Sequence, residues 1–140
     1  MPLGVGSGLW AIVQPKETTN LATNPSLEFG STGWSALGGG ATIGTTSYKQ
    51  AFGAWSLQIN HTITSEGAFL NMGTPAAGSY SLSAYVHGTS GHRYRLMAES
   101  AAGISLGAGS ITSVGAWQSI NTLFGLAAGT GLNIVARHID

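Results

Sequence analysis

The sequence predicts an all-β fold, an antiparallel β-sandwich or jelly roll with an extended N-terminal arm. Helical periodicity is nearly absent, because glycines interrupt the pattern in every window of about a dozen residues. Apolar and polar residues alternate with a period of two instead, and turn-forming stretches recur about every eight to twelve residues. Short strands that are apolar on one side bury that side by packing as two sheets.

Residues 1–19 form the predicted arm. Its apolar run is too short and too rich in glycine to span a bilayer, and no basic stretch precedes it as in a secretory signal. We therefore expect no transmembrane segment, no signal peptide and no membrane partner. An apolar segment beside a domain is costly in water, so it either packs back on the domain or anchors to a neighbouring subunit. We predict an assembly arm whose docking residues are Leu3, Leu9, Trp10, Ile12 and Val13.

Residues 20–140 form one predicted domain. It opens with NLATNPSLEFGSTGW, where an Asn-Pro turn leads into a strand with Leu27 and Phe29 facing the core and Trp34 closing one end. Glycine-rich stretches such as GSTG (30–33) and LGAGS (106–110) predict turns. Alternating runs predict strands at residues 56–62, 79–88, 93–100, 117–125 and 132–139.

Charge and cysteine content exclude several classes of function. The chain has five basic and five acidic residues, a formal net charge of zero and no cysteine. A chain with no net charge has no net electrostatic attraction to a phosphate backbone, so we expect no nucleic-acid partner. No disulfide framework or thiolate chemistry is available. Low net charge also favours association, which is typical of a protein that works in an assembly.

An ordered set of motifs resembles one known family. The pattern N-L-x-x-N-P-S-x-E-x-G-x-x-G-W is followed by GAWSLQI, GSYSLSAYV, Tyr-Arg-Leu and GAWQSI. Together they resemble the jelly-roll, galactose-binding-like carbohydrate-binding modules of families four and nine, over roughly residues 20–137. Domains of this kind serve as sugar-binding appendages of glycoside hydrolases, and similar ones occur without an enzyme in tail and other virion proteins of bacteriophages. The arm ending in QPKETTNLATNPS resembles the phage group most.

One departure from the family concerns the end of the chain. The family normally adds a closing strand after the run that matches LNIVARHID, whereas this sequence stops at Asp140. The resemblance therefore implies either a truncated chain or a sheet with an open edge. An open edge presents unpaired N–H and C=O groups and invites pairing with another chain.

The distribution of carboxylates argues against an enzyme. Asp140 is the only aspartate, and the four glutamates are scattered along the chain with no close pair in sequence. A glycosidase needs two carboxylates across one bond, and a Ser-His-Asp triad needs an orienting aspartate inside the domain. We predict no catalytic residues.

Metal binding receives little support from the sequence. His87 and His92 flank the turn GTSG and supply two nitrogens at most, with no carboxylate nearby in sequence, so we expect solvent-facing loop histidines rather than a zinc site. The family resemblance implies a structural calcium in some members, and Glu28 matches the first ligand position. The matching aspartate belongs to the missing strand, so we expect no cofactor, with calcium at Glu28 as the alternative.

Sugar binding is a stronger hypothesis. Such sites combine aromatic faces with a few polar groups above an apolar floor. We expect Trp34, Trp55 and Trp117 to pack in or at the edge of the core, which leaves Tyr85 as the best exposed aromatic residue. The predicted carbohydrate-binding residues are Tyr85, His87, Arg95, Glu99 and Asn121.

Two functions from different classes follow. The main prediction is a non-enzymatic structural or decoration protein of a bacteriophage virion, in its capsid or tail. Its partners would be other virion subunits, joined through the arm and sheet edges into a homo-oligomer such as a trimer. The alternative is an autonomous carbohydrate-binding module that attaches to a host-surface glycan or a polysaccharide.

Overall fold

The computed structural model describes residues 21, 30–47 and 54–140. The predicted arm, including Leu3, Leu9, Trp10, Ile12 and Val13, lies outside the described residues, and so does the predicted calcium ligand Glu28. Within the described residues the chain is all β, and no helix there is long and apolar enough to cross a membrane.

Nine β-strands make up the described part of the chain. Their bounds are β1 Trp34–Leu37, β2 Thr42–Thr46, β3 Ser56–Asn60, β4 Gly67–Asn71, β5 Gly78–Val86, β6 Arg93–Ser100, β7 Ser105–Thr112, β8 Gln118–Leu126 and β9 Leu132–His138.

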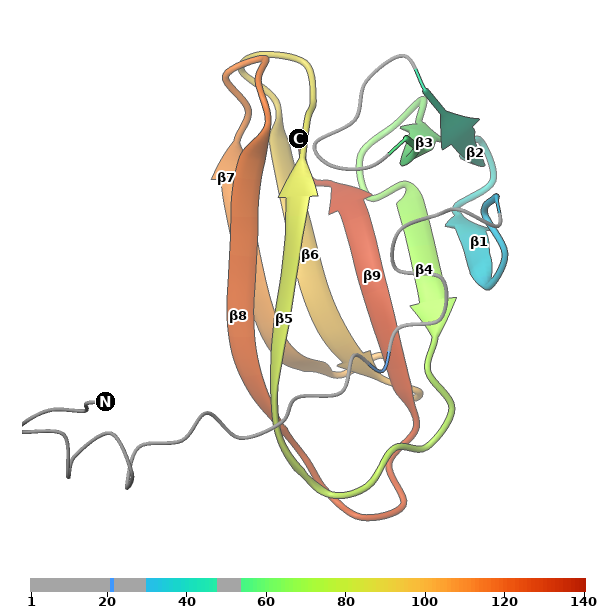
Figure 1. The fold of residues 1–140 in the computed structure, drawn as a ribbon, viewed down its shortest axis with the longest axis vertical. Helices are drawn as coiled ribbons and strands as arrows, with labels where there is room; N and C mark the ends of the chain where they lie inside the picture. The colour runs from blue at the N-terminus through green and yellow to red at the C-terminus, as the bar shows by residue number, and fades with distance from the viewer. Residues whose placement is uncertain (1–20, 22–29, 48–53) are drawn as a thin grey trace, which may run out of the picture.

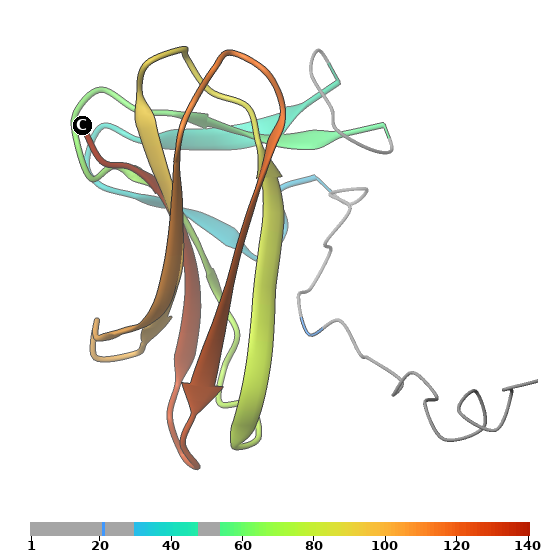
Figure 2. The ribbon, with the colours of Figure 1, turned by 90° about the vertical axis from the view of Figure 1, so that its left-hand side faces the viewer.

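The strands form three antiparallel sheets. One sheet has five strands in the order β1-β4-β9-β6-β7, and the pairs β5-β8 and β2-β3 form the other two. Figure 1 looks onto β5 and β8 with β6 and β7 behind them, and the rotated view in Figure 2 separates these layers. The β2–β3 hairpin and the end of the chain lie together at one end of the sandwich. The predicted antiparallel sandwich is therefore confirmed.

The core lies between the five-stranded sheet and the β5–β8 pair. Every second side chain of a strand faces this core, because successive side chains of a strand point to opposite faces. Each apolar side chain that is fully buried contributes about 1.5–3 kcal/mol. The central buried cluster consists of Leu70, Leu96, Ala98, Ile120, Phe124, Leu126, Leu132 and Ile134, against which Trp34, Tyr80, Leu82, Ala84 and Val86 pack.

The last strand is not an edge strand. β9 pairs with β4 on one side and with β6 on the other, so among the described strands the edges of the five-stranded sheet are β1 and β7. Open edges therefore exist among the described strands, at β1 and β7 instead of β9, and pairing of such an edge with another chain stays a prediction.

One local prediction is wrong. LGAGS (106–110) lies inside β7 instead of forming a turn, because its glycines let β7 run close to β8: a Cβ on Gly109 would come within 2.7 Å of the Ile120 side chain. Trp55 is 41% exposed, which excludes the interior of the core and leaves the core edge as the position expected from the sequence. Trp117 is half-buried and meets the ring of His87 edge-on at 5.5 Å.

Candidate functional site

The sandwich has two outer faces that its core does not occupy. We call the outward side of β1, β4, β9, β6 and β7 the five-strand face, and the outward side of β5 and β8 the two-strand face. The predicted sugar-binding residues divide between them. Arg95 and Glu99 alternate with core residues of β6 and point to the five-strand face, whereas Tyr85 and Asn121 point to the two-strand face and His87 follows β5 directly. The five residues therefore do not form one surface.

The two-strand face is rich in hydroxyl groups. Tyr85 is 51% exposed and Leu123 is 80% exposed. A shallow, open depression at one end of this face is lined by Ser79, Tyr80, Ser81, Leu123, Phe124 and Gly125. The polar side chains of the two-strand face are exposed serines, Tyr85 and Asn121, with no ionised group among the described residues of β5 and β8.

The five-strand face has an apolar floor. Phe69, Val135 and Met97 stand side by side in one row of the register across β4, β9 and β6. Val135 is only 2% exposed and Met97 6%, although both point away from the core cluster, while Ser35 and Ser110 nearer the sheet edges are exposed. The centre of this face is thus more buried than its margins.

An ion pair lies over this floor. Arg137 donates from a guanidinium nitrogen to Glu99 Oε1 at 3.1 Å, and the two side chains are only 24% and 17% exposed. In the register Arg137 stands opposite Arg95, and Glu99 stands opposite Asn133. The two side chains therefore meet by lying along the strands across Val135 and Met97. Sequence reasoning missed Arg137, although its place two residues after Val135 in an alternating run puts it on the same face.

Unused hydrogen-bonding capacity remains on the five-strand face. Arg137 Nε is buried and has no hydrogen-bond partner among the described residues. Arg95 is exposed, and its register position beside Arg137 places two like charges together. Asn71 and Asn133 are directly opposite each other at one end of the floor. Guanidinium, carboxylate and amide groups above an apolar floor are suited to a ligand with many hydroxyl groups.

Glu66 has a different environment, at the end of the sandwich that carries the β2–β3 hairpin. It is 3% exposed and accepts hydrogen bonds from the N–H groups of Gly40 (2.6 Å), Thr62 (2.6 Å) and Ile63 (3.2 Å) and from the Thr62 hydroxyl (3.0 Å). These bonds, led by that from the Thr62 backbone, lower the pKa of Glu66 to about 2. Glu66 and Glu99 therefore serve separate networks and do not face each other across a common space.

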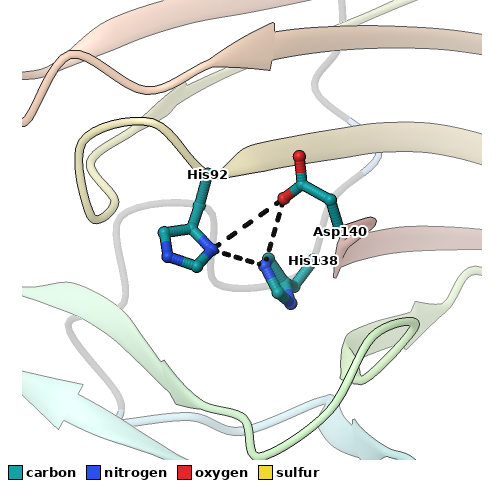
Figure 3. A group of neighbouring side chains, drawn as sticks. All are labelled: His92, His138 and Asp140. Carbon is teal, nitrogen blue, oxygen red and sulfur yellow. Dashed lines mark hydrogen bonds and ion pairs between the residues drawn. The ribbon is translucent and has the colours of Figure 1, made fainter.

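A second group of titratable side chains gathers at the same end of the sandwich. His92 precedes β6, His138 ends β9, and Asp140 follows it; Figure 3 shows the three side chains pointing toward one another. His92 Nδ1 lies 3.0 Å from His138 Nε2, and Asp140 Oδ1 lies 3.3 Å from His138 Nε2 and 3.9 Å from His92 Nδ1. His92 is an exposed loop histidine, as the sequence predicted, but it also contacts His138 and Asp140, which the sequence did not indicate.

The surroundings of this group are aromatic and basic. The ring of His61 stacks on His138 at 4.2 Å, and burial followed by the charges of His138 and His92 lowers the pKa of His61. The backbone N–H of Arg93, and then its side chain, lower the pKa of Asp140. The sequence signal for the group was the His-x-Asp spacing of residues 138–140, but the strand pairing that adds His92 could not be read from it.

Comparisons with known proteins support the fold. No family model and no curated protein matches the chain. Among solved structures, the fold is similar to the CBM22-1 xylan-binding domain of Paenibacillus barcinonensis Xyn10C, with a TM-score of 0.62, 20% identity and coverage of 79% of this chain and 78% of that chain. It is also similar to the CBM22-1–GH10 modules of Clostridium thermocellum xylanase 10B complexed with xylohexaose, with a TM-score of 0.58, 14% identity and coverage of 76% and 23%. The chain thus has the β-sandwich fold of a carbohydrate-binding module, while the family four or nine type stays a prediction.

Proposed function

We propose that this domain is a carbohydrate-binding module whose ligand lies on the five-strand face. The observation that carries the proposal is the half-buried Arg137–Glu99 pair above the floor of Phe69, Val135 and Met97. Ionised groups held partly below the surface have a desolvation cost, which hydrogen bonds to a bound ligand can offset. The fold is that of a domain described as xylan-binding, which supports the same function.

The chemistry of the face favours a neutral polysaccharide. Sugar hydroxyls both donate and accept hydrogen bonds, so one hydroxyl can accept from the exposed Arg95 while another donates to Glu99. The apolar C–H faces of a pyranose ring can lie on Phe69 and Met97. With a formal net charge of zero the chain exerts no long-range attraction on acidic polymers, so contact chemistry decides the ligand. β-Linked xylan is the first candidate.

The two-strand face, which carries Tyr85 and Asn121 of the five residues predicted from the sequence, is the competing location. A sugar ring could stack on Tyr85, but the rest of that face offers exposed serines and the isolated Leu123. Exposed hydroxyl groups are already well hydrogen-bonded to water. A ligand that replaces this water therefore gains less binding free energy than one that bonds to half-buried charged groups. We therefore place the ligand on the five-strand face.

Affinity electrophoresis in gels containing soluble xylan, followed by calorimetry with xylohexaose, tests the proposal. Wild type should be retarded by xylan, and Arg95→Ala should weaken binding about ten-fold through loss of a charged hydrogen bond. Arg95 is exposed, so its removal leaves the fold intact. Tyr85→Ala is the matched control on the opposite face and should bind as wild type does.

The reverse result, with Tyr85→Ala impaired and Arg95→Ala unaffected, would place the ligand on the two-strand face. If wild type is not retarded in gels that contain any of a panel of neutral polysaccharides, the carbohydrate-binding proposal is wrong.

The virion function predicted from the sequence has no support from the structural similarities or from the described residues. Its docking residues lie in the arm, outside the described residues. Virion location, virion subunits as partners and a homo-oligomer stay predictions.

A further inference from the structure

We propose that His92, His138 and Asp140 form a binding site for a divalent transition-metal ion of the zinc type. The site lies at the end of the sandwich that carries the β2–β3 hairpin, apart from the five-strand face, and does not depend on the proposed carbohydrate binding. Its three ligand atoms would be His92 Nδ1, His138 Nε2 and Asp140 Oδ1.

The spacing of these atoms fits a metal ion. Zinc holds nitrogen and oxygen ligands at about 2.0–2.2 Å, so tetrahedral ligands stand about 3.3–3.5 Å from one another. The three separations here are 3.0, 3.3 and 3.9 Å, which bracket that value. An ion could therefore be bound with side-chain adjustments of a few tenths of an ångström.

Backbone hydrogen bonds hold His138 and the residue before Asp140 in place. His138 stands opposite Tyr94 in the β6–β9 register, and its N–H donates to Glu66 O at 3.0 Å. Ile139, which follows β9 directly, donates to Arg93 O at 3.0 Å, and this bond fixes the chain just before Asp140.

The Asp140 carboxylate is oriented by a neighbour. Arg93 donates from its backbone N–H to Asp140 Oδ1 at 2.7 Å and from Nε to Oδ2 at 3.1 Å. Oδ1 is thereby directed toward the two imidazoles. Such partners around a ligand set its orientation and contribute substantially to metal affinity.

The donor set selects the class of ion. Two imidazole nitrogens and one carboxylate oxygen suit zinc and its neighbours, whereas calcium requires six to eight oxygens. His92 and Asp140 are 48% and 39% exposed at the side chain, so an ion can enter from solvent and a fourth ligand, such as water, can complete the tetrahedron.

One buried atom limits the affinity. When His138 binds a metal through Nε2 its proton must sit on Nδ1, and that atom is buried with no hydrogen-bond partner among the described residues. Loss of such an outer partner typically weakens metal binding about 10- to 100-fold. We therefore expect a dissociation constant in the micromolar range, weaker than that of a closed structural zinc site.

Calorimetric titration of the full 140-residue chain, without a histidine tag, with Zn²⁺ tests the site. Wild type should bind one equivalent, and Ca²⁺ should not bind at this site. At about 100 times the dissociation constant, Zn²⁺ should raise the Tm by about 10 °C, because the ion joins the turn before β6 to the end of β9 in the folded state alone.

Variants separate this site from nonspecific binding. His92→Ala removes an exposed ligand and should lower Zn²⁺ affinity at least about ten-fold without loss of folding. His87→Ala is the matched histidine control, since His87 contacts Trp117 instead of the cluster, and should bind Zn²⁺ as wild type does. The proposal would be overturned if no one-to-one complex formed at 100 µM Zn²⁺, which is about a hundred times a micromolar dissociation constant. It would also be overturned if both variants lost Zn²⁺ affinity equally.

Discussion

Glu66 shows at the residue scale how one side chain joins two loops. Its carboxylate accepts from Gly40 after β1 and from Thr62 and Ile63 after β3. The close approach requires glycine at position 40, where an added Cβ would lie 2.7 Å from Glu66 Oε1. A carboxylate bonded in this way is stabilised in its ionised form.

The pH dependence of stability should follow from this ionised form. The pKa of Glu66 falls from an ordinary value of 4.5 to about 2 in the folded protein. Its stabilising contribution is therefore complete above pH 4.5 and is lost as the pH falls through about 2.

Glu66→Gln should lower the Tm by about 5 °C at pH 7, because an amide cannot accept all of these bonds. The difference from wild type should narrow as the pH approaches 2, when thermal unfolding is followed by circular dichroism. Arg95→Ala is the control, because its side chain has no partner in this network. A difference that stays constant between pH 7 and pH 2 would contradict the role of the ionised form.

At the element scale, β7 depends on its glycines. Gly107 and Gly109 face β8, where a Cβ would come within 2.8 Å of Leu123 O and within 2.7 Å of the Ile120 side chain, respectively. Glycine at these positions lets the edge of the five-stranded sheet close on the β5–β8 pair. The same glycines made LGAGS a predicted turn, since a local propensity does not report a close approach between strands distant in sequence.

Gly109→Ala should destabilise the fold by about 1–3 kcal/mol, because β7 and β8 must separate to admit the methyl group. Gly125→Ala, on the outward side of β8, meets no atom within 4 Å and should change stability by less than about 1 kcal/mol. Urea unfolding of the two variants measures both values. Equal stability of the two variants would show that β7 does not require the close approach.

At the scale of the whole molecule, the fold class was predictable and the candidate sites were only partly so. Alternation assigned Leu96 to the core and Arg95 to an outer face, which the structure confirms. Alternation within a strand does not say which sheet the strand joins, because pairing is decided by contacts far apart in sequence. Arg95 and Tyr85 were therefore predicted on one surface, although they lie on opposite faces.

The dependence of pairing on contacts far apart in sequence also explains why the sequence did not reveal the Arg137–Glu99 and His138–His92 contacts. β9 lies between β4 and β6, and this position brings Arg137 to Glu99 across 38 residues and His138 to His92 across 46 residues. Neither pair has a local signature. Each pair follows directly once the strand order is known.

Titration of the ¹⁵N-labelled protein with xylohexaose, followed residue by residue by NMR, tests the central claim that carbohydrate binds to the five-strand face. We predict saturable shifts of the backbone amide signals of Asn71, Arg95, Met97 and Arg137 and of the side-chain N–H signals of Asn71, Arg95 and Arg137, with Tyr85 and Asn121 unchanged. Shifts confined to Tyr85 and Asn121, or no saturable shift with xylohexaose or any other neutral oligosaccharide, would contradict it.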